Sequence, residues 1–121
     1  MEIIPEGTPD AFVAACPSRE ILARLAEKWT FLIVIALQHG PMRFGALRRK
    51  VEGVSQKMLT QTLRNLEKDG LVTRQIYDEM PLRVEYELTA LGRELVPLNQ
   101  AIKDWAERNM RQILEVRSSG A

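Results

Sequence analysis

The segment from Trp29 to Leu37 is apolar on nearly every side, and a segment of this kind belongs in the interior of a fold. Periodicity alone does not separate a buried strand from a buried helix here. The length of the segment and the stop at Gly40-Pro41 favour a helix. Its unbroken apolar run, Phe31 to Leu37, is far shorter than the ~20 residues that span a bilayer. We therefore expect the central helix of a globular core and no contact with a membrane.

The composition agrees with a single soluble domain, because the 121 residues are 45% hydrophobic and 27% charged. A chain of this length buries roughly two thirds of its unfolded surface, so it needs no disulfide and no metal. Its one cysteine, Cys16, has no partner within the chain. The acidic start, Glu2 and Glu6, is unlike a secretory leader. We expect a cytoplasmic protein that carries no cofactor and no metal.

The charges divide the chain into three parts. Residues 41–76 hold eight basic and three acidic groups, a net charge of +5, whereas residues 1–40 and 77–121 each carry −2. A positive region in an otherwise slightly negative chain suggests a polyanionic partner. The alternative is that these lysines and arginines simply solvate helical surfaces.

Helix signals begin at Cys16, which we expect at an N-cap because Pro17 suits the first helical position. Residues 1–14 read as an arm. After the apolar segment, Phe44, Leu47 and Val51 predict a short helix that ends near Gly53, and basic side chains occupy its exposed positions.

The next helix is capped by Ser55 and ended by Asp69-Gly70. At 100° per residue its two faces differ sharply. The predicted core face holds Met58, Leu59, Thr62, Leu63 and Leu66. The predicted polar and basic face holds Lys57, Thr60, Gln61, Arg64 and Lys68.

A hairpin is predicted from residues 71–77 and 84–88, joined by a turn at 78–81. In its second strand apolar residues alternate with Glu85 and Glu87, which is typical of a half-buried edge strand. Two carboxylates in this spacing indicate a solvated edge more often than an acid–base pair.

The chain closes with a long helical region that Thr89 caps and that Pro97 kinks or restarts. Its apolar seam exceeds what so small a core needs, so a partner helix is expected to cover it. The alternative is that the helix packs back on its own domain. The residues of the seam are Leu91, Leu95, Leu98, Ile102 and Trp105.

This order of elements predicts a mainly α protein with a small β-hairpin, an α+β winged helix-turn-helix whose long C-terminal helix is expected to pack against a partner helix. We expect an arm at 1–14, the DNA-binding domain at 15–90 and the dimerisation helix and tail at 91–121. Lys57, Gln61 and Arg64 are suited to base edges, and Thr60 to a base or a phosphate. Arg83 near the hairpin tip is expected at the backbone or minor groove of double-stranded DNA. The full predicted set is Arg43, Arg48, Arg49, Ser55, Gln56, Lys57, Thr60, Gln61, Arg64, Lys68 and Arg83.

The chain also resembles the HxlR family of bacterial transcriptional regulators, related in architecture to MarR proteins, from Cys16 to about Trp105. The resemblance implies a homodimer, formed by the N- and C-terminal helices, that binds imperfect palindromes in promoters. At Ala26-Glu27 the chain departs from the small residues usual there, which leaves open where the first two helices separate. The matching motifs are Cys16-Pro17, Lys28-Trp29, Gly40-Pro41, Arg43-Phe44, Leu47-Arg48, Val54-Ser55-Gln56, Met58-Leu59-Thr60, Leu63, Leu66-Glu67, Asp69-Gly70-Leu71-Val72, Arg74, Tyr77, Pro81, Val84-Glu85-Tyr86, Leu88-Thr89 and Gly92.

Cys16 occupies the Cys-Pro position at which some members of that family sense disulfide stress, quinones or hypochlorite. Independently, a thiol at a helix N-cap has a lowered pKa, because the helix dipole and free N–H groups favour the thiolate. The alternative is a small buried side chain under the dimer helices. An oxidant or other small-molecule effector therefore remains an open expectation.

Other functions find less support in the residues. His39 is the only histidine and lies at a helix end without catalytic partners, so we expect no enzyme. Trp29, Phe44 and Trp105 are expected in the core rather than in an effector pocket. The competing function is a winged-helix module that contacts proteins and not DNA. Such a module is expected to expose apolar groups where this chain has Lys57, Gln61 and Arg64.

Overall fold

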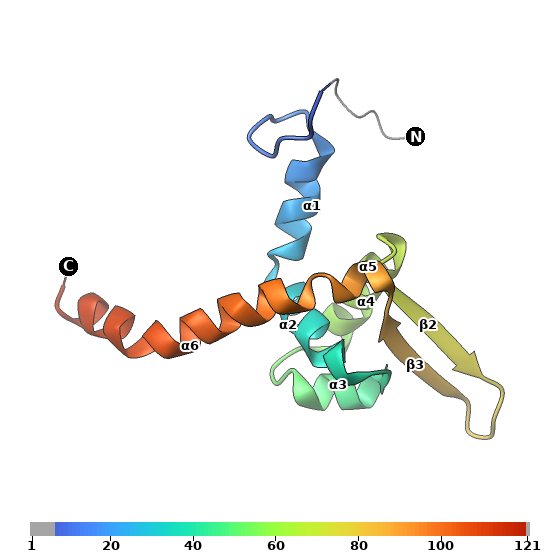
Figure 1. Ribbon diagram of the computed structural model, residues 1–121. Helices are drawn as coiled ribbons and strands as arrows, with labels where there is room; N and C mark the ends of the chain where they lie inside the picture. The colour runs from blue at the N-terminus through green and yellow to red at the C-terminus, as the bar shows by residue number, and fades with distance from the viewer. Residues whose placement is uncertain (1–6, 121) are drawn as a thin grey trace.

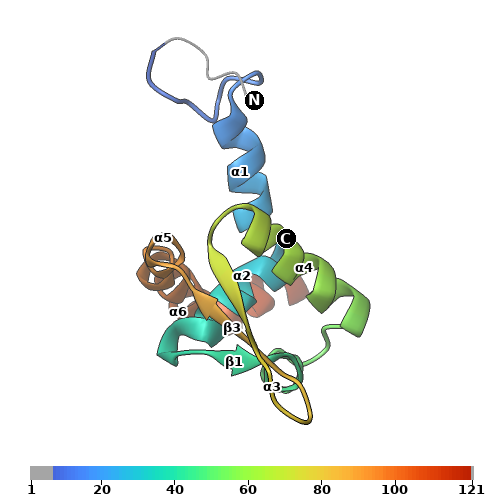
Figure 2. The same ribbon diagram turned by 90° about the vertical axis from the view of Figure 1, so that its right-hand side faces the viewer.

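The computed structural model describes residues 7–120 as mostly helical, with a small three-stranded antiparallel sheet (Figures 1 and 2). Within them no helix is long and apolar enough to cross a bilayer. Residues 7–14 of the predicted arm form turns and bends, and residues 1–6 and 121 lie outside the described part. The elements are α1 (Pro17–Leu25), α2 (Lys28–Ala36), the 3-10 helix η1 (Leu37–His39), β1 (Met42–Arg43), α3 (Phe44–Lys50), α4 (Gln56–Lys68), β2 (Val72–Tyr77), β3 (Arg83–Leu88), α5 (Ala90–Arg93) and α6 (Val96–Ser118).

The predicted central helix is α2. Ile33, Val34 and Leu37 have no exposed surface and form the middle of the core. α4 and α6 both pack against α2, and η1 continues it as far as His39 before Gly40 turns the chain at φ 136°. Trp29 and Phe44 pack against the edge of this core, as expected, whereas Trp105 is 54% exposed. The expectation of a core position is therefore wrong for Trp105.

Helices α1 and α2 separate at Ala26-Glu27 despite the departure from the family pattern. Glu27 takes an extended backbone conformation and its carboxylate accepts a hydrogen bond from the amide of Thr30 at 2.9 Å. A carboxylate in this position is a good N-cap, since it satisfies a free N–H and lies at the positive end of the helix. A charged cap thus supplies here the break that a small residue supplies elsewhere.

α1 projects away from the rest of the domain (Figures 1 and 2) and has no buried residue. Its base is held by Arg24, whose Nη1 donates to both carboxylate oxygens of Asp69 at 2.7 and 2.9 Å. Asp69 is the C-cap of α4. The ion pair therefore ties the projecting helix to the end of α4.

Local signals account for both ends of α4. Ser55 is the N-cap, as predicted, and its hydroxyl accepts a hydrogen bond from the amide of Met58 at 3.1 Å. At the other end Gly70 takes φ 74°, and the amides of Gly70 and Leu71 bond back to Glu67 and Leu66. This is a Schellman ending, which needs a residue that tolerates the left-handed conformation.

The predicted core face of α4 is confirmed for Leu59, Thr62, Leu63 and Leu66. It is wrong for Met58, which is 39% exposed. The first turn of α4 extends past the core, whose first member from this helix is Leu59.

The hairpin forms as predicted, with Val72 opposite Leu88 and Tyr77 opposite Arg83. Its second strand is not an edge, because the short β1 pairs with its other side through Met42 and Tyr86. The strand order is β1-β3-β2, so β2 and β1 are the edges. A strand as short as β1 leaves no alternation in the sequence, which is why the edge assignment failed.

Thr89 caps α5 through a bond from the amide of Gly92 at 3.1 Å, and its own hydroxyl donates to the carbonyl of Gly70 at 2.7 Å. Pro97 lies in the first turn of α6, so it starts a new helix, one of the two predicted outcomes. α6 runs across α2 and extends beyond the domain (Figure 1). Asn99 is buried at the crossing and donates to the carbonyl of Phe31 at 3.3 Å.

Gly92 marks the closest approach between α5 and the start of the sheet. A Cβ at this position would overlap the carbonyl oxygen of Leu71 and crowd Leu88. That carbonyl is held in place because it also accepts from the amide of Thr89 at 3.0 Å.

We predict that Gly92→Ala lowers the free energy of unfolding by about 1–3 kcal/mol, because backbone must move to admit the methyl group. Gly45→Ala is the matched control, since a Cβ there meets only the mobile end of Arg49 at 3.4 Å within α3. Alanine is the better helix former, so the control should be neutral or stabilising by up to about 1 kcal/mol. Urea denaturation at one protein concentration measures both, and equal stability of the two variants would contradict the account of Gly92.

Candidate nucleic-acid interface

The polar face of α4 is open along its length. Gln56, Lys57, Gln61 and Arg64 are exposed, as are Ser55 before the helix and Lys68 at its end, while Thr60 is half-buried. The opposite face is anchored by Leu59, Leu63 and Leu66, each no more than 2% exposed. The structure therefore brings the predicted residues of α4 together on one rigid surface.

The predicted arginines before and within α3 are also exposed, namely Arg43, Arg48 and Arg49. Arg43 immediately precedes α3, and the other two lie in its last turn with Lys50. α3 packs on α2 through the fully buried Leu47. These cations thus stand on a short helix whose inner side is held by the core.

The basic residues of α3, of α4 and immediately before α3 form no ion pairs among the described residues. Within residues 7–120, no carboxylate lies within 4.0 Å of Arg43, Arg48, Arg49, Lys50, Lys57, Arg64 or Lys68. In contrast Arg24, Arg74, Arg83 and Arg93 each form at least one ion pair with Glu or Asp. The positive charge of α3 and α4 is therefore available to an external anion. We call these seven residues, which lie in α3, in α4 and immediately before α3, the basic face.

Arg83 differs from the other predicted contacts. Its guanidinium stacks on the ring of Tyr77 at 3.8 Å and pairs with Glu79 at 3.0 Å and Glu85 at 3.4 Å. Its buried Nε has no hydrogen-bond partner among the described residues. A contact with DNA would have to compete with two carboxylates, so the structure favours a role in holding the hairpin.

The hairpin tip presents residues that sequence reasoning did not select. Met80 is 99% and Leu82 is 61% exposed, on either side of Pro81. The hairpin loop and α3 lie at the same end of the molecule, opposite α1 (Figure 2). The turn residues predicted the loop, but nothing in their pattern indicated an exposed apolar tip.

Cys16 lies where the sequence predicts, at the N-cap of α1, and only 4% of it is exposed. Its side chain does not cap the helix. Instead Sγ lies 3.0 Å from the hydroxyl of Ser18 and accepts from the amide of Asp10 at 3.4 Å. These bonds lower the pKa of the Cys16 thiol, with the Ser18 hydroxyl as the largest cause, then the Ser18 and Asp10 amides. Cys16 is one of the residues that line a surface pocket between Ala14 and Ala23.

The predicted dimer seam is largely uncovered. Leu91, Leu98, Ile102 and Trp105 are each more than half exposed, whereas Leu95 is half-buried against the core. Ile21 and Leu22 of α1 are also exposed. Two grooves of about 590 Å³ each lie between α1 and α6, and Leu95 and Leu98 line both.

Comparison with known proteins assigns the chain to a family. Residues 24–114 match the model of the HxlR-like helix-turn-helix family. This chain belongs to that family. It is 46% identical to the HTH-type transcriptional regulator YtfH of Escherichia coli (strain K12) over 110 residues, which are 91% of this chain and 87% of the relative.

Solved structures of the family have the same fold. The transcriptional regulator ytfH of Salmonella typhimurium superposes with a TM-score of 0.85 at 44% identity, covering 92% of this chain and 99% of that one. The redox regulator HypR in its oxidised form gives a TM-score of 0.72 at 39% identity, covering 78% and 97%. The winged helix-turn-helix architecture expected from the sequence is thus confirmed, while the roles of individual residues stay predictions.

Proposed function

We propose that this protein is a sequence-specific DNA-binding transcriptional regulator that acts as a homodimer on palindromic promoter sites. The observation that carries the proposal is the basic face, whose seven cations are all exposed and, within residues 7–120, have no carboxylate within 4.0 Å. Its membership of the HxlR-like family supports the same function. A regulator of this kind acts in the cytoplasm, where bacterial DNA lies, and we assign it no enzymatic activity.

We expect α4 and the arginines of and before α3 to make different kinds of contact with DNA. α4 is about as wide as a major groove, and its anchored core face leaves Lys57, Gln61 and Arg64 directed outward to base edges. We expect the exposed Arg43, Arg48 and Arg49 to bind phosphates beside the groove. Phosphate contacts orient the protein, and the base contacts of α4 select the sequence.

A homodimer follows from the uncovered seam. α1 and α6 project from the domain and leave large apolar side chains in water. Exposed apolar surface on this scale marks an interface in a soluble protein. A second copy of the chain presents the same surface, so a twofold dimer covers both seams and matches a palindromic site.

A module that contacts only proteins is the competing function. It would be favoured by apolar residues on the outer side of α4, where the structure has Gln61, Arg64 and Lys68. A titration of the protein with DNA distinguishes the DNA-binding regulator from the protein-contact module.

We predict that the protein binds its own upstream intergenic DNA more tightly than a scrambled duplex, measured by fluorescence anisotropy. The affinity should fall steeply with salt, because binding releases counterions from each phosphate that is neutralised. Weak and equal binding to both duplexes would show that this promoter is not its site. Absence of binding to either duplex at low salt would favour the protein-contact module.

We predict that Arg64→Ala costs about 1–3 kcal/mol of specific binding, since a bidentate base contact is lost. Arg117→Ala is the matched control, because Arg117 is exposed in the last turn of α6, outside the basic face. The control should bind as the unchanged protein does. An unchanged affinity of the Arg64 variant would remove this residue from the reading surface.

We predict that Ile102→Glu shifts the protein from dimer to monomer, because the substitution places a charge in the middle of the apolar seam. Met80→Glu is the control, an equally large exposed apolar residue at the hairpin tip and outside the seam. Sedimentation velocity measures both. A dimer that survives Ile102→Glu, or a monomeric unchanged protein, would contradict the proposed interface.

We further propose that the regulator responds to oxidants or electrophiles through Cys16. The lowered pKa of the thiol and the pocket beside it support the proposal, since the thiolate is the reactive form. The redox regulator HypR, which has been solved in an oxidised and a reduced form, is 39% identical to this chain. Because Cys16 is the only cysteine, its products are a sulfenic acid, an adduct, a mixed disulfide or a bridge between chains.

We predict that mild peroxide or quinone treatment modifies Cys16 in the folded protein, measured by mass spectrometry. Ser18→Ala should slow the reaction near neutral pH, because losing the main hydrogen bond to sulfur raises the pKa of the thiol. Ser119→Ala, at the end of α6, is the control and should react at the original rate. An unmodified Cys16 would end the sensor hypothesis and leave a structural thiol.

A further inference from the structure

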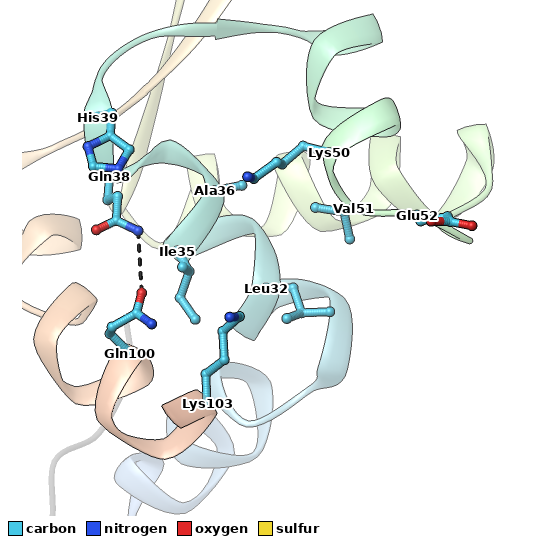
Figure 3. A pocket seen from close by; sticks show the side chains of 10 residues that line it. All are labelled: Leu32, Ile35, Ala36, Gln38, His39, Lys50, Val51, Glu52, Gln100 and Lys103. Carbon is cyan, nitrogen blue, oxygen red and sulfur yellow. Dashed lines mark hydrogen bonds between the residues drawn. The ribbon is translucent and has the colours of Figure 1, made fainter. Parts of the chain in front are cut away.

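A small cavity of about 270 Å³ lies between α2, the end of α3 and α6 (Figure 3). Its apolar side is formed by Leu32, Ile35 and Val51. Ile35 and Val51 are themselves buried, so this wall is part of the core and keeps its shape. The cavity shares Lys50 with the basic face and Leu32 with one of the two grooves between α1 and α6.

Two lysines from distant parts of the chain line this cavity. Lys50 comes from the last turn of α3 and Lys103 from α6. Figure 3 shows both ammonium ends directed toward the space between the helices, whereas the carboxylate of Glu52 points away from the other side chains. Lys103 also pairs with Glu107 at 2.8 Å, and this bond raises the pKa of Lys103. A ligand anion at Lys103 therefore shares the ammonium with Glu107.

Two amides complete the polar side. Gln38 of η1 donates to the side-chain oxygen of Gln100 on α6 at 3.4 Å, close to the upper limit for such a bond. A bond this long is readily exchanged for one to a ligand. The cavity thus offers positive charge, a donor and an acceptor opposite an apolar wall.

These features select one class of ligand. The volume of about 270 Å³ is below the roughly 300–1,000 Å³ of pockets for drug-sized molecules, which favours a ligand smaller than a nucleotide. Inorganic phosphate would leave the apolar wall facing an anion, which is unfavourable. A metal ion is equally disfavoured by two ammonium groups.

We propose that this cavity binds a small organic acid, with its carboxylate between Lys50 and Lys103 and its apolar body against Leu32, Ile35 and Val51. The site joins α6, which carries the dimer seam, to the end of α3 in the helix-turn-helix. An occupied site therefore links the position of α6 to that of α3, and this consequence rests on the proposed function.

The test is calorimetric titration of the whole protein with benzoate and hexanoate, and with benzamide as the uncharged match of benzoate. Both acids should bind, and benzamide should bind at least about tenfold more weakly, because it forms no charged hydrogen bonds. Binding of benzamide as tightly as benzoate would assign the interaction to the apolar grooves and overturn the proposal. Absence of binding by either acid at millimolar concentration would also overturn it.

Lys103→Met keeps the aliphatic stem, and we expect it to weaken benzoate binding at least about tenfold. Lys28→Met is the control, since Lys28 lies over the ring of Trp29 at 4.3 Å and does not line the cavity. Benzoate should bind the control with the original affinity, and circular dichroism confirms that both variants fold. An unchanged affinity of the Lys103 variant would overturn the site.

The link to DNA is measured separately by repeating the anisotropy titration with saturating benzoate. A changed DNA affinity in the unchanged protein, absent in Lys103→Met, supports the link. If DNA binds but benzoate has no effect, the link is wrong. If no DNA binds, the proposed function fails, whereas calorimetry still decides whether the acid site exists.

Discussion

The burial of α2 is the constraint on which the rest of the structure depends. Its side chains are apolar all round, and Ile33, Val34 and Leu37 have no exposed surface because α4 and α6 pack against the helix. Covering one helix on every side requires contributions from segments throughout the chain. Each covering helix is therefore oriented by its contact with α2, and what it presents on its outer side becomes the functional surface.

α4 shows how this orientation becomes a function. Its core residues turn the polar residues outward, and the Ser55 cap and the Gly70 ending limit its length. The cations of α3 and α4 stay unpaired within residues 7–120, while the acidic residues of the hairpin pair with Arg83 and Arg93. The net charge of the whole chain is only +1, so the basic face arises from the local excess of cations in residues 41–76 and not from the total charge.

α1 and α6 represent the opposite case, because they leave apolar residues in water. α1 is attached through the ion pair between Arg24 and Asp69 and through Leu25, which packs against the core, and it has no buried residue. A helix with no buried residue in the single chain is expected to bury its apolar side chains against a partner. The cavity beneath α6 is lined by Gln100 and Lys103 of α6 and by Lys50 of α3.

The sequence by itself determined the helices, the hairpin, the caps at Ser55 and Thr89 and the faces of α4, because these depend on local backbone preferences and on periodicity. It also placed the charge excess in residues 41–76. Only the tertiary structure decided which side chains pair and which strand lies inside the sheet. Arg24 pairs with Asp69, β1 pairs with β3 over a long separation, and Lys50 and Lys103 line one cavity. Contacts between residues far apart in the chain leave no local pattern, since they arise from how the helices pack around α2.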